Sequence, residues 1–290
     1  MSPGGFKSRG AVALGALMIS FAAPIVKQVT VGPTVSAFYR MLFGALGLFL
    51  LLALNERWRR GWRHGWGASA AIAFFFALDL WFWHRSVIWL GPGLSTLLAN
   101  FQVFILPLGA WLLSGERSGR RFSTALALAA TGLWLMFGLN WQTFTAQNRL
   151  GILFGLLTAA AYAAYILSLQ AAQRCPGAPA TVARLFQVTL LTAVMIAVSA
   201  ALEGLSLAVP TTGDWLLLIA YGLLCQVLGW LLITRGLPAV PAAVAGLLLL
   251  LQPSLSMLWD VVFFALLLGP WQWAGVVLAL GGIYLGSRRL

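Results

Sequence analysis

The chain has 290 residues, of which 61% are hydrophobic and only 8% are charged, and its mean hydropathy is +0.92. A soluble globular domain carries roughly 25% charged residues, so this composition excludes a protein whose main solvent is water. The net charge of +12 would favour a nucleic-acid partner in a soluble protein. Here the Lys and Arg residues lie mostly in short connections between apolar segments, which excludes that partner and indicates membrane topology.

Apolar segments bounded by charged residues or by Gly and Pro follow one another along the chain. A bilayer core about 30 Å thick requires about 20 apolar residues per helix, and the segments do not show the alternating pattern of barrel strands. They predict an all-α membrane protein with ten transmembrane helices. In chain order the predicted spans are residues 10–29, 33–54, 67–89, 93–114, 122–139, 150–170, 182–202, 214–234, 242–267 and 271–287.

The cations of the connections predict the orientation of these spans, because Lys and Arg accumulate in cytoplasmic loops. With the N-terminus on the cytoplasmic side, that side holds Lys7, Arg9, Arg57, Arg59, Arg60, Arg63, Arg117, Arg120, Arg121, Arg174, Arg184, Arg235, Arg288 and Arg289. The opposite side holds Arg85 and Arg149, while Lys27 and Arg40 lie inside or near the outer ends of spans. We therefore expect cytoplasmic N- and C-termini in a bacterial-type inner membrane.

The two halves of the chain resemble each other. A shift of 150 residues lays Arg85 on Arg235 and Gln102 on Gln252 in the same order along the chain. Since each half has five predicted spans, the second copy must enter the membrane from the opposite face. The pattern predicts two inverted five-helix repeats, residues 1–145 and 146–290, around a central cavity, an arrangement common in secondary transporters.

Short motifs at the ends of both halves carry a family resemblance. The motifs resemble the EamA-type exporters of the drug/metabolite transporter superfamily: the turn Leu-Leu-Ser-Gly-Glu-Arg at residues 112–117, Leu251-Gln252-Pro253 in the ninth span, and residues Gln272 to Gly275 in the tenth. Departures are Val103 and Leu266, where a proline and an acidic residue are expected. The resemblance implies that helices 1–4 and 6–9 surround the cavity and that helices 5 and 10 are peripheral. Within the superfamily, the aromatic-rich third span favours amino-acid exporters of the YddG type.

Charged residues at membrane depth are functional hypotheses by default. Asp79 lies near the middle of the third span with aromatic residues one turn away on either side. It can bind the ammonium group of a substrate or carry a coupling proton, or it can be a structural carboxylate bonded to a neighbouring helix. His84 lies about 140° from Asp79 around the helix and shares a face with Trp81. For His84 a place at the cavity mouth and a packing hydrogen bond are both open, and Trp81 is included with it in the predicted substrate site.

Polar side chains of three other spans complete the predicted substrate site. Asn100, Gln102 and Gln252 must face protein or water, because amides are unsatisfied in lipid, and either cavity lining or interhelical hydrogen bonding accounts for them. Tyr162 and Tyr165 have apolar rings and polar tips suited to a cavity wall, although packing alone also accounts for them.

Charged residues nearer the span ends are suited to salt bridges or to anchoring a helix at the membrane surface. Asp260 can pair with Lys27 or Arg40 as a structural salt bridge or an outer gate. Arg40 and Arg184 are interpreted as snorkelling anchors. Pro24, like Pro107 and Pro253, predicts a kink inside a span.

These observations predict a secondary transporter that exports a small neutral or zwitterionic metabolite by alternating access. Few charges and many aromatic residues favour hydrophobic or aromatic amino acids, with sugars, nucleotide conjugates and cationic drugs as the alternative cargo classes. An intramembrane enzyme is the alternative of another class, but HExxH and GxSxG motifs do not occur, nor does a P-loop. We expect no enzyme activity, cofactor or metal; partners are the small-molecule substrate and the lipid bilayer, and proton coupling and the oligomeric state stay open.

Overall fold

The computed structural model describes residues 3–59, 61–102, 104–105, 120–138, 141–236 and 248–287. Regular structure in these residues is entirely helical, which confirms the predicted fold class at this level. Val103, Pro107 and the motif at residues 112–117 lie outside the described part of the chain.

The helices of the first half follow the predicted order. They are α1 (Pro3–Ser20), α2 (Ala22–Gln28), α3 (Pro33–Leu54), the short η1 (Glu56–Arg59), α4 (Trp66–Leu90), α5 (Pro92–Ala99), α7 (Arg120–Leu133), the π-helical η2 (Trp134–Gly138) and η3 (Trp141–Thr143).

The second half is described over residues 146–236 and 248–287. Its helices are α8 (Ala146–Arg174), α9 (Thr181–Leu202), α10 (Thr212–Ala220), the π-helical η4 (Tyr221–Gly229), α11 (Trp230–Gly236), α13 (Leu251–Phe264) and α14 (Pro270–Ser287).

Six helical segments of the described chain are long and apolar enough to cross a membrane. They are Lys7–Gln28, Pro33–Leu54, Trp66–Leu90, Ala146–Leu169, Thr181–Leu202 and Thr212–Gly236. These segments correspond to the first, second, third, sixth, seventh and eighth predicted spans. The described parts of the other four predicted spans contain α5, α7, α13 and α14.

The first span is interrupted where its proline predicts a kink. Pro24 has no N–H group and its ring crowds the carbonyl of residue 20, and the helix breaks at Phe21 between α1 and α2. The Ser20 carbonyl instead accepts a hydrogen bond from the Ser256 hydroxyl of α13, 3.3 Å away. The proline therefore leaves a backbone acceptor that joins α1 to a helix of the other half.

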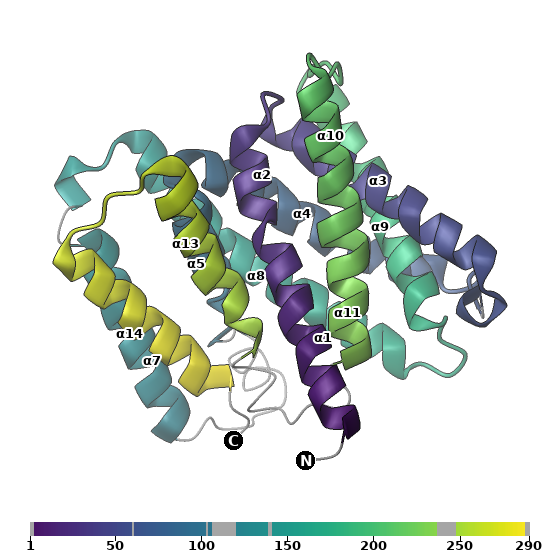
Figure 1. The fold of residues 1–290 in the computed structure, drawn as a ribbon, viewed down its shortest axis with the longest axis horizontal. Coiled ribbons are helices and arrows are strands. Elements are labelled where there is room, and N and C mark those ends of the chain that lie inside the picture. The colour runs from purple at the N-terminus through teal and green to yellow at the C-terminus, as the bar shows by residue number, and fades with distance from the viewer. Residues whose placement is uncertain are drawn as a thin grey trace.

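Neighbouring helices pack in pairs that are clear in the ribbon (Figure 1). Helices α7 and α14 lie together at one end of the molecule, and α3 and α9 lie at the other, with α1, α11, α4 and α8 between them. At the α7–α14 contact, a Cβ atom on Gly132 would lie only 2.6 Å from the Ala279 nitrogen. The absence of a side chain there is what allows the two backbones to approach.

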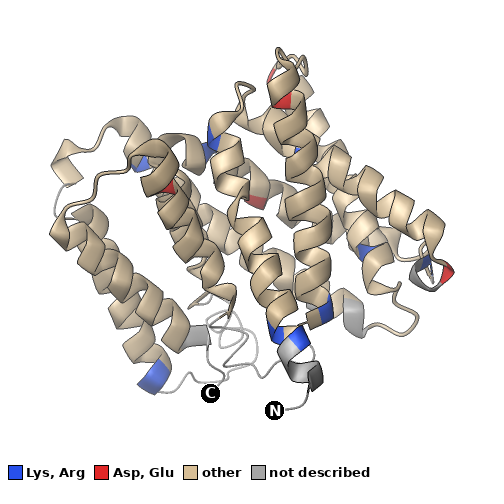
Figure 2. Cartoon of the chain, viewed as in Figure 1, with Lys and Arg blue, Asp and Glu red and all other residues tan. Residues whose placement is uncertain are grey.

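The ends of the helices define two faces of the molecule. Helix α1 begins and α14 ends on the lower face in Figure 1, whereas α2 and α10 reach the upper face. Figure 2 shows charged residues mainly near helix ends and tan, uncharged ribbon along most of the helix middles. The few charges that do lie at depth are the ones that define the candidate site.

Candidate functional site

A cavity of about 300 Å³ lies between helices of both predicted halves. Its wall combines residues between Ile19 and Gln102 with residues between Thr158 and Gln252. Its lining includes Leu169 of α8, Ile233 of α11 and Leu249, which lies just before α13. The site is therefore built from helices that are far apart in sequence.

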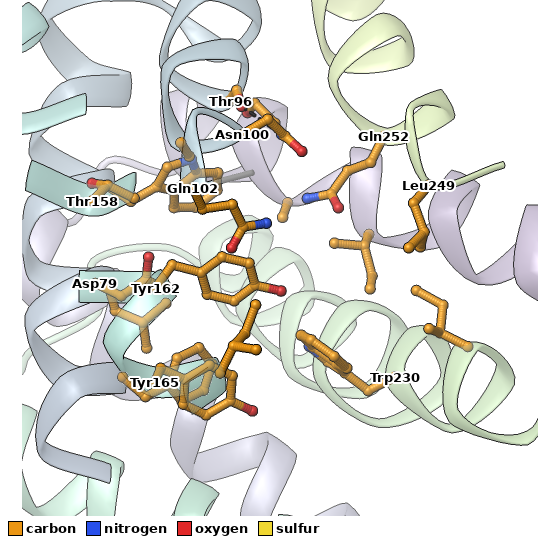
Figure 3. Close-up of a pocket in the computed structure, with 18 of the residues that line it drawn as sticks. Asp79, Thr96, Asn100, Gln102, Thr158, Tyr162, Tyr165, Trp230, Leu249 and Gln252 are labelled. Carbon is orange, nitrogen blue, oxygen red and sulfur yellow. Dashed lines mark hydrogen bonds between the residues drawn. The ribbon is translucent and has the colours of Figure 1, made fainter. Parts of the chain in front are cut away.

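Aromatic rings form one wall of the cavity. Tyr162 and Tyr165 stack on each other with ring centroids 5.7 Å apart, and Phe76 of α4 stacks on Tyr165 at 4.7 Å. Trp230 faces these rings from the opposite side (Figure 3). No hydrogen bond of the two tyrosine hydroxyl groups is found among the described residues, so their polar tips are available in the cavity.

Asp79 is the acidic residue of this wall. Helix α4 places it in the cavity lining together with three neighbours on the same helix. Phe76 and Trp83 lie about one turn away on either side, and Leu80 is the next residue. Its exposed fraction is only 8%. The described residues provide neither a hydrogen bond nor a salt bridge to its carboxylate, so the interhelical bond considered for Asp79 is not found there.

Three amide side chains border the same space. Asn100 uses its Nδ2 group to donate to the Thr96 carbonyl, 2.8 Å away, within its own helix end. Gln102 and Gln252 extend into the cavity from opposite sides (Figure 3). The Oε1 atom of Gln102 is buried without a hydrogen-bond partner. The amides therefore leave acceptor groups for a ligand or for water.

Trp81 and His84 do not line the cavity. Trp81 lies two residues from Asp79, about 200° around the helix, and its indole N–H donates to Glu203 at 2.8 Å. His84 is fully buried; its Nδ1 lies 2.7 Å from the Leu80 carbonyl and its Nε2 lies 3.1 Å from the Tyr221 hydroxyl. Both residues therefore contact neighbouring helices outside the lining of this cavity, and their role in substrate binding stays a prediction.

Arg40 lines the cavity, although its position near a span end predicts a snorkelling anchor. Only 6% of the residue is exposed. Its Nη1 group donates to the Tyr221 hydroxyl at 3.1 Å and its Nε group to the Gln226 amide oxygen at 3.3 Å. The sequence does contain an indication of this location, namely the distance of Arg40 from the end of its span. Arg40 lies seven residues after the start of α3, about 10 Å along the helix axis.

Arg184, the other arginine interpreted as a snorkelling anchor, has a different environment. Its Nη1 group donates to the Gly65 carbonyl and to the Ser69 hydroxyl, at 2.8 and 2.7 Å. These bonds join the start of α9 to the start of α4. Arg184 is therefore buried at a helix contact and is neither a snorkelling anchor nor part of the cavity wall.

Two ion pairs lie beyond the cavity, toward the upper face. Lys27 of α2 and Asp260 of α13 form a salt bridge of 3.3 Å, and Asp260 also accepts from the Gly93 backbone N–H at 3.1 Å. Arg85 of α4 and Glu203, just beyond α9, form a salt bridge of 2.6 Å. The structural salt bridge considered for Asp260 and Lys27 is thus present, and Arg40 is not part of it.

Glu203 is the centre of a polar cluster at this face, which we call the Glu203 cluster: Thr34, Trp81, Arg85, Ser199 and Glu203. Burial raises the pKa of Glu203, but hydrogen bonds from Trp81, Ser199 and Thr34 and the charge of Arg85 outweigh it. The pKa of this carboxylate therefore lies below its ordinary value, and the group is ionised at neutral pH.

Comparisons with known proteins point to one family. Residues 149–288 match the model of the EamA-like transporter family. A Bacillus subtilis (strain 168) protein described as the uncharacterized transporter YwfM is 28% identical over 174 residues, which are 60% of this chain and 56% of that protein. A solved structure whose description reads only 'Crystal structure of protein' superposes with a TM-score of 0.67. The match covers 98% of this chain and 99% of the chain in that structure. At 19% identity that last likeness shows the fold alone.

Proposed function

Because the chain is an EamA-type transporter of the drug/metabolite transporter superfamily, we propose that it exports a small zwitterionic metabolite, most suitably a hydrophobic or aromatic amino acid. The observation that carries this proposal is the buried carboxylate of Asp79, which has no hydrogen-bond or salt-bridge partner among the described residues and lies in the same cavity wall as apolar and aromatic side chains. An ammonium group satisfies a buried carboxylate, and stacked rings accommodate an apolar or aromatic side chain. The family description, a family of transporters, supports a transport function.

Two inverted five-helix repeats, residues 1–145 and 146–290, are the architecture that we propose for this transport. Support comes from the cavity wall, to which both halves contribute Gln102 and Gln252 as repeat mates on opposite sides. Secondary transporters bind substrate near the midplane between such repeats. Ten membrane spans with both termini in the cytoplasm of a bacterial-type inner membrane follow from the hydropathy and the cation distribution.

The conformation agrees with an inward-facing state of an alternating-access cycle. Support comes from α11, which carries the cavity-lining Ile233 and reaches the lower face, where α1 begins (Figure 1). On the upper face, the Lys27–Asp260 and Arg85–Glu203 ion pairs join helices of the two halves. Substrate would enter from the cytoplasm and leave after these outer contacts separate.

A counterflow screen in proteoliposomes tests the cargo. We expect labelled phenylalanine or leucine to exchange, and a sugar, a nucleotide conjugate and a cationic dye not to exchange. Asp79→Asn should reduce amino-acid exchange roughly 10- to 100-fold, the value of a hydrogen bond to a charged group. The control is Glu56→Gln, which removes a carboxylate whose side chain is 94% exposed. Exchange of another cargo class without any amino acid contradicts the proposal.

A further inference from the structure

Arg40 is a buried cation whose partners are all neutral. Among the described residues it bonds to the Tyr221 hydroxyl and to the Gln226 amide oxygen, and its guanidinium lies 5.0 Å from the centroid of the Tyr221 ring. No carboxylate of the described chain forms a salt bridge with it, although Asp79 borders the same cavity. A buried cation is ordinarily paired with an anion, so the positive charge of Arg40 calls for a partner from outside the protein.

The donor groups of Arg40 are only partly used. A guanidinium has five N–H donors, and the described contacts engage the Nε group and one N–H of Nη1. The Nη2 group has no hydrogen bond among the described residues. Since the side chain is part of the cavity lining, its remaining donors can form the two parallel bonds by which arginine binds a carboxylate.

The π-helical segment η4 supplies both protein partners of Arg40. Tyr221 and Gln226 are five residues apart, and in an α-helix they would point about 140° away from each other. In the i→i+5 bonding of a π-helix, residues at this spacing share a face. The local π-helix therefore turns both side chains toward one arginine, and such segments are frequent at functional sites.

Glycines bring η4 close enough to α3 for these contacts. A Cβ atom on Gly44 would lie 2.6 Å from Cγ of Gln226, and one on Gly222 would lie 2.5 Å from Cβ of Phe43. The amide of Gln226 is oriented by its own donor bond to the Thr189 hydroxyl at 3.1 Å. Its oxygen is thereby left to accept from Arg40.

A series of hydrogen bonds runs from the Nη1 group of Arg40 through Tyr221 and His84 to the Leu80 carbonyl. Arg40 donates to the Tyr221 hydroxyl, so this hydroxyl donates in turn to Nε2 of His84. The Leu80 carbonyl can only accept, so Nδ1 of His84 carries a proton and donates to it at 2.7 Å, which leaves Nε2 of the neutral ring to accept from Tyr221. Each group has one consistent role, and the series fixes Arg40 from α3 through η4 to α4.

We propose that Arg40 binds the carboxylate of the transported substrate, with Tyr221, Gln226 and His84 as its positioning residues. This inference rests on the proposed function and deepens it: it names the residue that binds the carboxylate of the zwitterion and makes that carboxylate a requirement for tight binding. The opposite charges of Arg40 and Asp79 at one cavity then match the two charges of a zwitterion. An amine that lacks the carboxylate leaves Arg40 unpaired and binds more weakly.

Exchange of phenylalanine and of phenethylamine, its analogue without a carboxylate, tests the inference in proteoliposomes. The wild type should prefer phenylalanine, and Arg40→Gln should lower that preference roughly 10- to 100-fold while phenethylamine is still exchanged. Tyr221→Phe removes only the hydroxyl and should raise KM for phenylalanine several-fold with little change for phenethylamine. The matched control is Arg184→Gln, a buried arginine outside the cavity wall, which should keep the wild-type preference.

The outcomes separate this inference from the proposed function. A wild type that exchanges phenylalanine and phenethylamine equally well overturns the role of Arg40 and leaves amino-acid transport standing. An unchanged preference in Arg40→Gln does the same. If Arg40→Gln exchanges neither compound, Tyr221→Phe decides, and an unchanged preference there overturns the inference. A wild type that exchanges no amino acid overturns both proposals together.

Discussion

Lys27 and Asp260, which are 233 positions apart in the chain, form a salt bridge of 3.3 Å between α2 and α13. The Asp260 side chain is fully buried, whereas that of Lys27 is 32% exposed. Asp260 also accepts from the Gly93 backbone, and a Cβ atom on the neighbouring Gly91 would lie 2.5 Å from its Oδ2 atom. Three segments therefore converge on one carboxylate at the outer side of the cavity.

Removal of Lys27 should loosen this outer contact. Lys27→Met leaves the Asp260 carboxylate buried without its cation, and an unpaired buried charge is strongly unfavourable. We expect an impermeant maleimide, added from the outer face, to label Thr96→Cys in the cavity wall roughly tenfold faster, a shift of about 1.4 kcal/mol in the equilibrium between closed and open states. Cys175 and Cys225 are first replaced by serine and alanine.

A double substitution is the control for the Lys27 experiment. Lys27→Met combined with Asp260→Asn removes both charges, so no buried ion is left unpaired and labelling should fall back toward the wild-type rate. Equal labelling of wild type and Lys27→Met would mean that the pair does not contribute to outer closure.

Glu203→Gln should lower the stability of the outer face in a pH-dependent manner. Because the folded-state pKa of Glu203 lies below its ordinary value of 4.5, its contribution is present above pH 4.5 and is lost as the pH falls through the lowered pKa. Partly exposed ion pairs contribute about 0.2–1 kcal/mol, so the melting temperature of Glu203→Gln should be slightly lower at pH 7. Thermal unfolding of detergent-solubilised protein measures the difference, which should shrink in acid; a constant difference from pH 7 to pH 3 would contradict a role for the ionised carboxylate.

The hydrophobic pattern predicts most of the helices because it reflects the length of chain that must cross the bilayer. Residues 33–54 are predicted from their apolar composition, and α3 spans the same residues. Pro24 likewise predicts a kink, and the break at Phe21 follows from its missing N–H. Local chemistry suffices in both cases.

The side chains of the cavity are harder to predict because each depends on partners far away in sequence. Helix α4 carries apolar residues on all sides, so the sequence does not show that Asp79 faces the cavity while Trp81 and His84 face other helices. Arg40 looks like an interfacial anchor until Tyr221 and Gln226 are brought to it. No residue pattern in 221–229 signals the π-helix that does so.

Substitution by valine should have different effects on stability at two adjacent glycines of α14. A Cβ atom on Gly282 would lie 2.7 Å from the Ala125 carbonyl oxygen and the Ala129 nitrogen of α7, whereas one on Gly281 would meet nothing within 4 Å. Gly282→Val should therefore force α7 and α14 apart and destabilise the protein by about 1–3 kcal/mol. Gly281→Val should be close to neutral. Melting temperatures measured side by side test this, and equal losses would contradict the close packing of α7 against α14.

Asp79→Asn also tests whether transport is coupled to protons. Asp79 is the acidic residue of the cavity lining, and a carboxylate can alternate between binding a proton and binding the ammonium group of the substrate. Asparagine has nearly the same shape but cannot take up a proton. If Asp79 carries the proton, amino-acid uptake into proteoliposomes should depend on pH in the wild type, and the residual uptake of Asp79→Asn should not. Glu56→Gln, which alters a carboxylate at the surface, should keep the wild-type pH profile. A pH dependence that persists in Asp79→Asn would show that Asp79 is not the group that carries a coupling proton.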